Sequence, residues 1–160
     1  MFARTFTRKW CFPVRAIVQR VSRAEVRVDG SPVGRIGRGF VILLGIAKGD
    51  SPTDADFIDD RIAGLRIFAD QAGKMNLALA PVGGELLVIS QFTLHADTGQ
   101  RRPSFSNAAP PEQARELYEY FLSLVRRRGV RVEAGRFGVH MEVELVNDGP
   151  VTIILDSRIC

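Results

Sequence analysis

Cysteine and histidine are scarce in this sequence of 160 residues. The two cysteines, Cys11 and Cys160, lie in opposite terminal segments, and the two histidines, His95 and His140, are isolated from each other. Without a Cys-x-x-Cys pair or a histidine cluster, the usual zinc site lacks its ligands, so we expect no metal and no cofactor. So few cysteines also favour a reducing compartment, and we expect a cytoplasmic protein.

Long apolar segments are absent as well. The longest stretch of apolar side chains, interrupted only by Gly45, is residues 40–47, well short of the ~20 residues that cross a bilayer. We therefore expect no contact with a membrane and interpret this stretch as a buried strand. The hydrophobic fraction of 46% and the charged fraction of 25% are typical of a single globular domain.

The body of the chain has no large surplus of one charge. The net charge is +4, but residues 1–13 carry three of these charges and no acid. A nearly neutral body argues against nucleic-acid binding by bulk charge, so any such contact needs a local patch. Arg101 and Arg102 are candidates for phosphate contacts, whereas we interpret the arginines at 126–128 as cations at a helix C-terminus.

Several familiar catalytic motifs are missing, including Gly-x-Ser-x-Gly, His-Glu-x-x-His and Gly-x-x-x-x-Gly-Lys. The glycines between residues 34 and 39 precede a predicted strand, so they indicate turns and not a dinucleotide-binding loop. Serine, glutamine, threonine, asparagine and backbone groups are left for a site. They suit the binding and orientation of a labile bond such as an ester, with backbone N–H groups stabilising an oxyanion.

Hydrophobic periodicity predicts two helices and ten strands. The helices are 51–65, which begins with Pro52 and acids, and 110–128, which has one apolar face and Gly129 as its cap. The predicted strands are residues 15–21, 24–29, 33–36, 40–47, 66–68, 74–77, 85–94, 130–134, 140–146 and 151–155.

The strand predicted at 85–94 ends in polar residues. Period two places Gln91 and Thr93 on one face, about 7 Å apart, with Ser90 on the other. Because Ser90 and His95 then point to opposite faces, the pattern argues against a catalytic triad. The polar pair predicts either the wall of a site or an edge strand that faces water.

Residues 147–150, Asn-Asp-Gly-Pro, are a dense cluster of turn formers between two predicted strands. Asn-Gly or Asp-Gly alone suffices to close a hairpin. The added Pro150 removes an N–H group and lowers the cost of a cis peptide bond at Gly149–Pro150. The cluster predicts a rigid turn, and two interpretations stay open: a turn alone, or a turn that is part of a site.

Together these motifs resemble the D-aminoacyl-tRNA deacylase family. The resemblance covers about residues 14–156, which we take as one domain, and leaves 1–13 and the tail 157–160 as extensions. We expect 1–13 to be disordered or a mis-assigned start, with a transit peptide as the alternative. The matching segments, in the family's order, are 15–21 (RAIVQRV), 65–68 (LRIF), 73–76 (GKMN), 83–87 (GGELL), 90–94 (SQFTL), 102–105 (RPSF) and 147–152 (NDGPVT).

The resemblance implies a mixed α+β fold, with a largely antiparallel, barrel-like sheet and two main helices. It also implies a homodimer with its site at the interface, where a cis Gly149–Pro150 corner enters the partner's site and excludes L-amino acids. The substrates would be D-aminoacyl-tRNA and glycyl-tRNA. The implied catalytic residues are Ser90, Gln91, Phe92 and Thr93, and the implied substrate-binding and chirality-selecting residues are Phe137, Met141, Asn147, Gly149, Pro150, Val151 and Thr152, with Arg20 holding the corner.

Two mechanisms are consistent with these residues. Thr93 can be a nucleophile, or water can attack the ester while the N–H groups of Phe92 and Thr93 bind the oxyanion and the ribose 2′-hydroxyl assists. We prefer water, since only His95 offers Thr93 a base. His95 also departs from the family, which more often has tyrosine there. The alternative function is a non-catalytic RNA-binding or scaffold protein with the same fold.

Overall fold

The structure, a computed structural model, describes residues 13–158. The predictions for residues 1–12 and 159–160 lie outside these residues. The described elements, in chain order, are β1 (Arg15–Val28), β2 (Ser31–Ile36), β3 (Gly39–Gly45), α1 (Pro52–Gly64), β4 (Phe68–Ala69), β5 (Met75–Leu77), the 3-10 turn η1 (Ala80–Val82), β6 (Glu85–Ser90), the 3-10 turn η2 (Phe92–His95), α2 (Pro111–Arg127), β7 (Val132–Ala134) and β8 (Glu142–Asp156).

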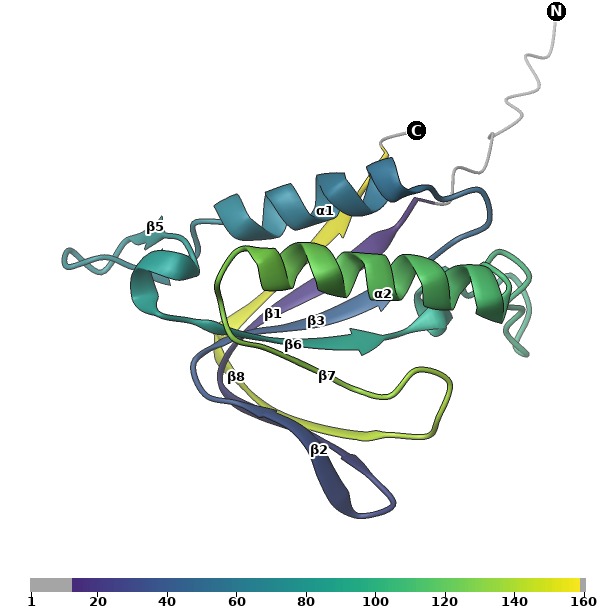
Figure 1. Cartoon of the computed structure of the whole chain (residues 1–160), viewed down its shortest axis with the longest axis horizontal. Helices are drawn as coiled ribbons and strands as arrows, with labels where there is room; N and C mark the ends of the chain where they lie inside the picture. Colours follow the sequence, from purple (N-terminus) through teal and green to yellow (C-terminus); the bar gives the residue numbers. More distant parts are fainter. Residues whose placement is uncertain (1–12, 159–160) are drawn as a thin grey trace, which may run out of the picture.

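The main sheet has the strand order β2-β1-β3-β6-β7, and β8 pairs with β1. β1 is antiparallel to β2, β3 and β8, whereas β3, β6 and β7 are parallel to one another. The parallel pairs are joined through α1 and α2, because parallel neighbours need a long crossover. Both helices cover one face of a strongly curved, barrel-like sheet (Figure 1). The predicted α+β class with two main helices is confirmed, although the residue pattern alone did not predict parallel strands.

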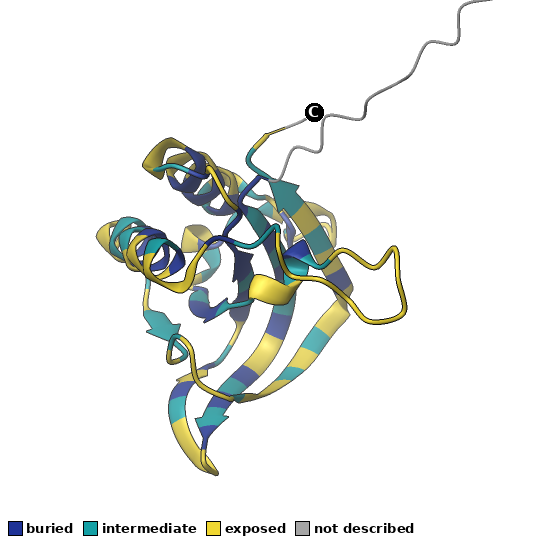
Figure 2. Cartoon of the chain, turned by 90° about the vertical axis from the view of Figure 1, so that its right-hand side faces the viewer, coloured by how far each residue is buried: buried dark blue, intermediate teal, exposed yellow. Residues whose placement is uncertain are grey.

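The core lies on both faces of β3, which explains its uninterrupted apolar stretch. Phe40, Ile42 and Leu44 belong to the larger cluster between the sheet and the helices, whereas Val41 belongs to a smaller cluster on the other face. Each helix turns its buried side toward the sheet (Figure 2). The predicted apolar face of α2 is confirmed, because its members are all buried: Ala114, Leu117, Tyr118, Phe121, Leu122 and Val125.

The basic end of α2 has a structural partner. Arg128 follows the helix, and its Nη2 lies 2.7 Å from Oδ2 of the buried Asp59 on α1. Arg126 and Arg127 are exposed in the last turn, where cations interact favourably with the helix dipole. The structural interpretation of the arginine run is therefore confirmed. No helix within residues 13–158 has the length and apolarity needed to cross a membrane.

The rigid turn predicted at residues 147–150 does not separate two strands, because β8 is one strand of 15 residues that passes through this segment. β8 pairs with β1, which is likewise one strand where two were predicted. Gln19 pairs with Thr152 and Val21 with Asn147. Residues 148–151 therefore have no ladder partner and form a bulge opposite one residue of β1. We call residues 148–151 the Gly-Pro bulge.

The strand predicted at 85–94 is too long. β6 ends at Ser90, after which Gln91 N donates to Leu44 O. The next residues form η2, where Leu94 N donates to Gln91 O and Ala96 N donates to Thr93 O. The polar residue types at 90–93 mark the point where the chain leaves the sheet. The faces predicted for residues 91–95 from the alternation of a strand are therefore wrong.

Candidate active site

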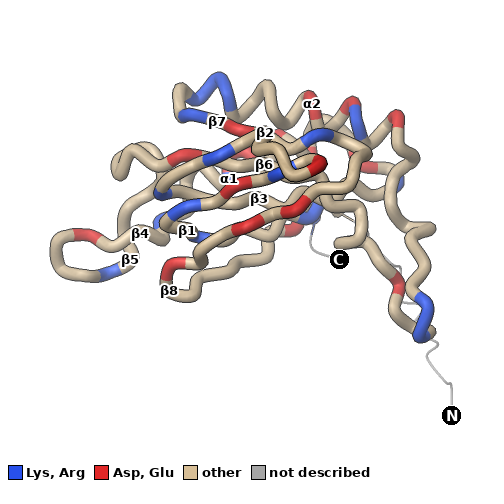
Figure 3. The backbone as a smooth tube through the Cα atoms, turned by 90° about the horizontal axis from the view of Figure 1, so that it is seen from below, with Lys and Arg blue, Asp and Glu red and all other residues tan. Residues whose placement is uncertain are grey.

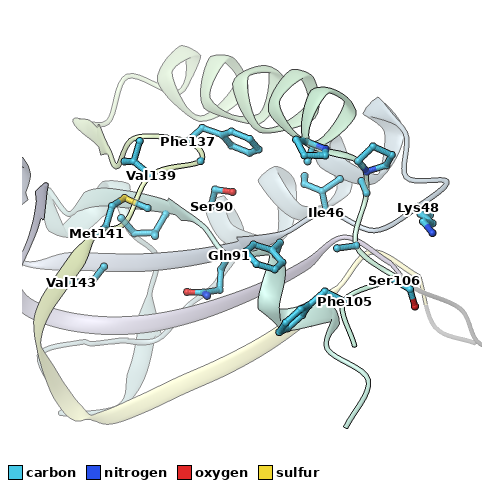
Figure 4. A pocket seen from close by; sticks show the side chains of 18 residues that line it. Ile46, Lys48, Ser90, Gln91, Phe105, Ser106, Phe137, Val139, Met141 and Val143 are labelled. Carbon is cyan, nitrogen blue, oxygen red and sulfur yellow. The ribbon is translucent and has the colours of Figure 1, made fainter. Parts of the chain in front are cut away.

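A cavity of about 800 Å³ opens where β6 ends. Four segments far apart in the sequence form its wall, as Figure 4 shows: residues 46–48, 89–92, 105–114 and 137–143. Most of the lining side chains are apolar, and the few polar groups include Lys48, Ser90, Gln91 and Ser106. A concave, mainly apolar site with a few polar groups is typical of a small-molecule site.

Five of the predicted site residues line this cavity, namely Ser90, Gln91, Phe92, Phe137 and Met141. In Figure 4, Ser90 lies between Phe137 and Gln91, and Met141 lies at the same end of the cavity as Phe137. The Met141 side chain packs against Gly135 at the other end of the 135–141 loop, because a Cβ at Gly135 would lie 2.5 Å from Met141 Sδ. The sequence therefore brings residues 90–92 and 137–141 together across about 45 residues of intervening chain.

Thr93 is not among the residues that line the cavity. Its hydroxyl accepts a hydrogen bond from Gln91 Nε2 at 2.5 Å. An amide donor does not remove a proton, so this contact orients Thr93 without activating it. Within residues 13–158, no basic side chain forms a hydrogen bond with Thr93 Oγ1.

The side chain of His95, the last residue of η2, is turned toward the interior. It is 4% exposed, and its Nε2 has no hydrogen-bond partner in the described structure. Burial lowers the pKa of the His95 imidazole, and a hydrogen bond with the backbone of Gly45 only partly opposes this effect. The imidazole is thus neutral at neutral pH and packs against β3. This placement does not support His95 as a base for Thr93.

The opposite wall of the cavity depends on Phe137. Its ring lies 5.8 Å from the ring of Tyr118, measured between centroids, and Arg115 Cζ lies 5.1 Å above it. Tyr118 is itself fixed, because its hydroxyl donates to Val88 O at 3.0 Å. Contacts with aromatic and cationic side chains therefore hold the 135–141 loop over the cavity.

The Gly-Pro bulge is closed at its base by Asn147. Asn147 Nδ2 donates to Val151 O and to Thr152 Oγ1, at 3.2 and 3.0 Å, and Val151 N donates to Asn147 Oδ1 at 2.7 Å. Asp148, Gly149 and Pro150 are exposed, and the Gly149–Pro150 peptide bond is cis. One asparagine therefore fixes the width of the bulge and makes Gly149 and Pro150 project.

Arg20 holds the bulge from the side. Its Nε donates to Asp148 O at 2.8 Å, and its Nη1 donates to Ile67 O at 2.5 Å. The Arg20 side chain is only 13% exposed. This largely buried arginine therefore connects the bulge to the backbone at Ile67. Neither Arg20 nor any residue from 147 to 152 lines the cavity of the same chain.

The loop with Arg101 and Arg102 stands apart from both features. Both arginines are exposed, and neither lines the large cavity. Arg102 borders a separate polar hollow with Asp97 and Ser104. Within the described residues, no group of three or more histidine, cysteine, aspartate or glutamate side chains could hold a metal ion.

Some residues that line the cavity were not predicted from the sequence. Lys48 follows β3 in a short connection, and no local pattern marks it as part of a site. Val139 and Ala109 line the cavity from loops whose position depends on distant packing. Phe105 carried a signal, since it ends the 102–105 motif. Its ring meets that of Phe92 edge-on, with 5.1 Å between centroids.

The fold and the cavity define a small α+β protein with a mainly apolar site at the end of β6. Residues 17–156 match the family model D-Tyr-tRNA(Tyr) deacylase. The chain is 60% identical over 146 residues to a D-aminoacyl-tRNA deacylase of Anaeromyxobacter dehalogenans, an alignment that covers 91% of this chain and 98% of the relative. A D-aminoacyl-tRNA deacylase of Symbiobacterium thermophilum is 54% identical, with 91% and 97% coverage. The chain therefore belongs to the D-Tyr-tRNA(Tyr) deacylase family.

Two solved structures have the same fold. The c-Myc DNA unwinding element binding protein is 40% identical, with a TM-score of 0.85 and coverage of 91% of this chain and 99% of that one. A probable eukaryotic D-amino acid tRNA deacylase has a TM-score of 0.77, with 91% and 100% coverage. At 18% identity, this second likeness concerns the fold alone.

Proposed function

We propose that this protein hydrolyses the ester bond of D-aminoacyl-tRNA, releasing the D-amino acid and the tRNA in the cytoplasm. The observation that supports the proposal is that the residues implied for the site lie in two separate places on one chain. Ser90, Gln91 and Phe92 line the cavity, whereas the Gly-Pro bulge projects elsewhere on the same chain. The family match and the names of the relatives support the same activity.

A homodimer would unite the two parts. In a twofold dimer each chain offers the same surface, so each chain can give its bulge to the partner and receive the partner's bulge at its own cavity. Exposed apolar side chains lie at both ends of this contact: Val139 and Val143 at the cavity, and Val146 and Ile154 on either side of the bulge. Such side chains favour an interface between two copies.

The cavity mouth suits the end of a nucleic-acid strand. Phe92 and Phe105 are 54% and 38% exposed and form an edge-to-face pair at the cavity. Lys48 lines the same cavity and forms no ion pair within residues 13–158. Aromatic rings with a nearby cation are the usual means by which proteins hold an unpaired nucleotide. We therefore place the terminal nucleoside of the charged tRNA at this mouth.

The projecting bulge would select the substrate by exclusion. The Gly149 carbonyl would accept a hydrogen bond from the substrate's amino group, so an L side chain would meet the bulge and a D side chain would point away. A thousandfold preference requires about 4 kcal/mol, which a rigid clash provides more easily than added attraction. Glycine has no side chain to exclude, so glycyl-tRNA should be a second substrate.

Water is the nucleophile that these residues favour. Phe92 and Thr93 are the first two residues of η2, and the first N–H groups of a helical turn have no acceptor within it. Both N–H groups are therefore free to stabilise the oxyanion as water adds to the ester carbonyl. The substrate's own 2′-hydroxyl would assist by taking or relaying the proton.

Purified protein should release D-tyrosine from charged tRNA and leave L-tyrosyl-tRNA near its spontaneous rate of hydrolysis. Initial rates with the two substrates measure the selectivity directly. Retained tRNA binding without turnover of either substrate would contradict the proposal. That result would favour a non-catalytic nucleic-acid-binding protein, a role suggested by the name of one relative, the c-Myc DNA unwinding element binding protein.

The Thr93→Ala variant should keep deacylation within about tenfold of the parent rate, because the oxyanion donors at residues 92 and 93 are backbone groups. Loss of an essential nucleophile lowers kcat by several orders of magnitude instead. Single-turnover release of D-tyrosine separates the two cases, and Thr93→Ser is the matched control. A Thr93→Ala protein without activity would contradict attack by water, and an acyl group trapped on Thr93 would establish covalent catalysis.

A further inference from the structure

Arg66 is exposed and lies outside both the cavity and the Gly-Pro bulge. In the described part of the chain, only neutral groups form hydrogen bonds with its guanidinium. Arg66 Nε donates to Asn76 O at 3.0 Å, and Arg66 Nη2 donates to Asn76 Oδ1. Arg66 forms no ion pair with any residue from 13 to 158. Other arginines do contact carboxylates: Arg15, Arg20, Arg23, Arg27, Arg35, Arg128, Arg131 and Arg158. The charge of Arg66 is thus fixed in direction and not neutralised.

The segment that carries Arg66 is tied to the Gly-Pro bulge. Arg20 donates both to Asp148 O in the bulge and to Ile67 O, the residue next to Arg66. The β4–β5 hairpin, which contains Asn76, projects from the end of the molecule at which β8 bends (Figures 1 and 3). A partner cavity that receives the bulge would therefore have Arg66 beside it.

The hairpin presents a cationic surface to this region. Lys74 is exposed and forms no ion pair within the described residues. The nearby acid, Asp70, is turned into the hairpin, because its Oδ1 accepts hydrogen bonds from Ala72 N and Lys74 N at 2.9 and 3.0 Å. The exposed cations around Asn76 are Arg66 and Lys74, and the apolar Met75 next to Lys74 is 57% exposed.

We propose that Arg66, oriented by Asn76, binds a phosphate in the acceptor arm of the tRNA whose aminoacyl end occupies the partner's cavity. The proposal rests on the proposed function. A guanidinium fork held in one direction matches the geometry of a phosphate. Phosphate contacts position a nucleic acid without reading its bases. Arg66 therefore contributes to the binding of the tRNA body and not to hydrolysis of the ester.

Two substrates separate these roles: D-tyrosyl-tRNA, and the D-tyrosyl ester of adenosine, which has no phosphate. Arg66→Ala should raise the KM for charged tRNA about fivefold and reduce the salt dependence by about one phosphate contact. Asn76→Asp should have the same effect, because a carboxylate at this place neutralises the guanidinium. Hydrolysis of the adenosine ester should not change in either variant.

Arg127→Ala removes an exposed arginine at the end of α2 and should leave both substrates unaffected. An equal loss on both substrates would mean that Arg66 acts through the bulge, and an unchanged KM for charged tRNA would also overturn the proposal. Binding of uncharged tRNA, followed by fluorescence anisotropy on the same variants, tests Arg66 without turnover. If the parent protein hydrolyses neither substrate, the proposed function fails, and this binding measurement still decides the role of Arg66.

Discussion

Replacing Gly149 with alanine should lower the ratio of D- to L-aminoacyl-tRNA hydrolysis from roughly a thousand toward ten, a loss of about 2.7 kcal/mol of discrimination. Gly149 has φ +145°, in the region that favours glycine. A Cβ there would lie 2.8 Å from Val151 Cγ2 and 3.1 Å from Arg20 Nη2. The bulge must therefore shift, and the Gly149 carbonyl with it. Single-turnover rates with D- and L-tyrosyl-tRNA measure the ratio.

Gly129→Ala is the matched control for this experiment. Gly129 also has a positive φ, +79°, but a Cβ there would meet nothing within 4 Å. This variant should lose about 1 kcal/mol of stability from backbone strain and keep its selectivity. A folded Gly149→Ala protein with an unchanged ratio would show that the Gly-Pro bulge does not select the chirality of the substrate.

The sequence predicted well the elements in which the apolar residues along the chain are the residues that the fold buries. Residues 114–125 repeat at helical spacing and are buried on one face of α2, so the local pattern and the tertiary structure agree. The stretch at 40–47 predicted a buried strand because both faces of β3 meet apolar clusters. Neither result required knowledge of which strands are neighbours.

The predictions were wrong where pairing with a strand distant in the sequence overrides the preference of the local residues. Asn147 to Pro150 are turn formers, yet β1 pairs on both sides of them and keeps β8 running in one direction. The excess residues are expelled as a bulge, and the Asn147 side chain supplies the hydrogen bonds that a turn would otherwise make with its own backbone. Nothing within residues 147–152 indicates that a strand of 14 residues lies beside them.

The candidate site divides in the same way. The polar end of an apolar strand is a local signal that marked Gln91 and Thr93, and the family resemblance added Ser90 and Phe92. Of these four residues, Ser90, Gln91 and Phe92 line the cavity. The rest of the wall comes from connections such as 46–48. A local hydrogen bond from Ala47 N to Asp50 Oδ2 shapes this connection, and a non-local one from Lys48 N to Asn107 O fixes its position. The parallel pairing of β3 and β6 brings these connections to one edge of the sheet. A residue pattern without strand neighbours cannot predict such a meeting.

The selectivity lost in Gly149→Ala should be restored by a second chain that has no activity of its own. Ser90→Trp is such a chain, because the indole occupies the cavity while the Gly-Pro bulge stays intact. In a mixed dimer, the open cavity of the Gly149→Ala chain receives the normal bulge of the Ser90→Trp chain. With a tenfold excess of Ser90→Trp, hydrolysis of L-tyrosyl-tRNA by the Gly149→Ala chains should fall about tenfold, since most of them then have an intact partner.

Co-expression of the two chains with different affinity tags allows the mixed dimers to be purified and assayed with both substrates. The control chain carries Ser90→Trp and Gly149→Ala together and should restore nothing, because it supplies neither an open cavity nor a normal bulge. If the bulge served the cavity of its own chain, Gly149→Ala would stay unselective beside any partner. Failure to recover mixed dimers would contradict the homodimer itself. Restoration by Ser90→Trp alone therefore requires that the Gly-Pro bulge acts on the cavity of the neighbouring chain.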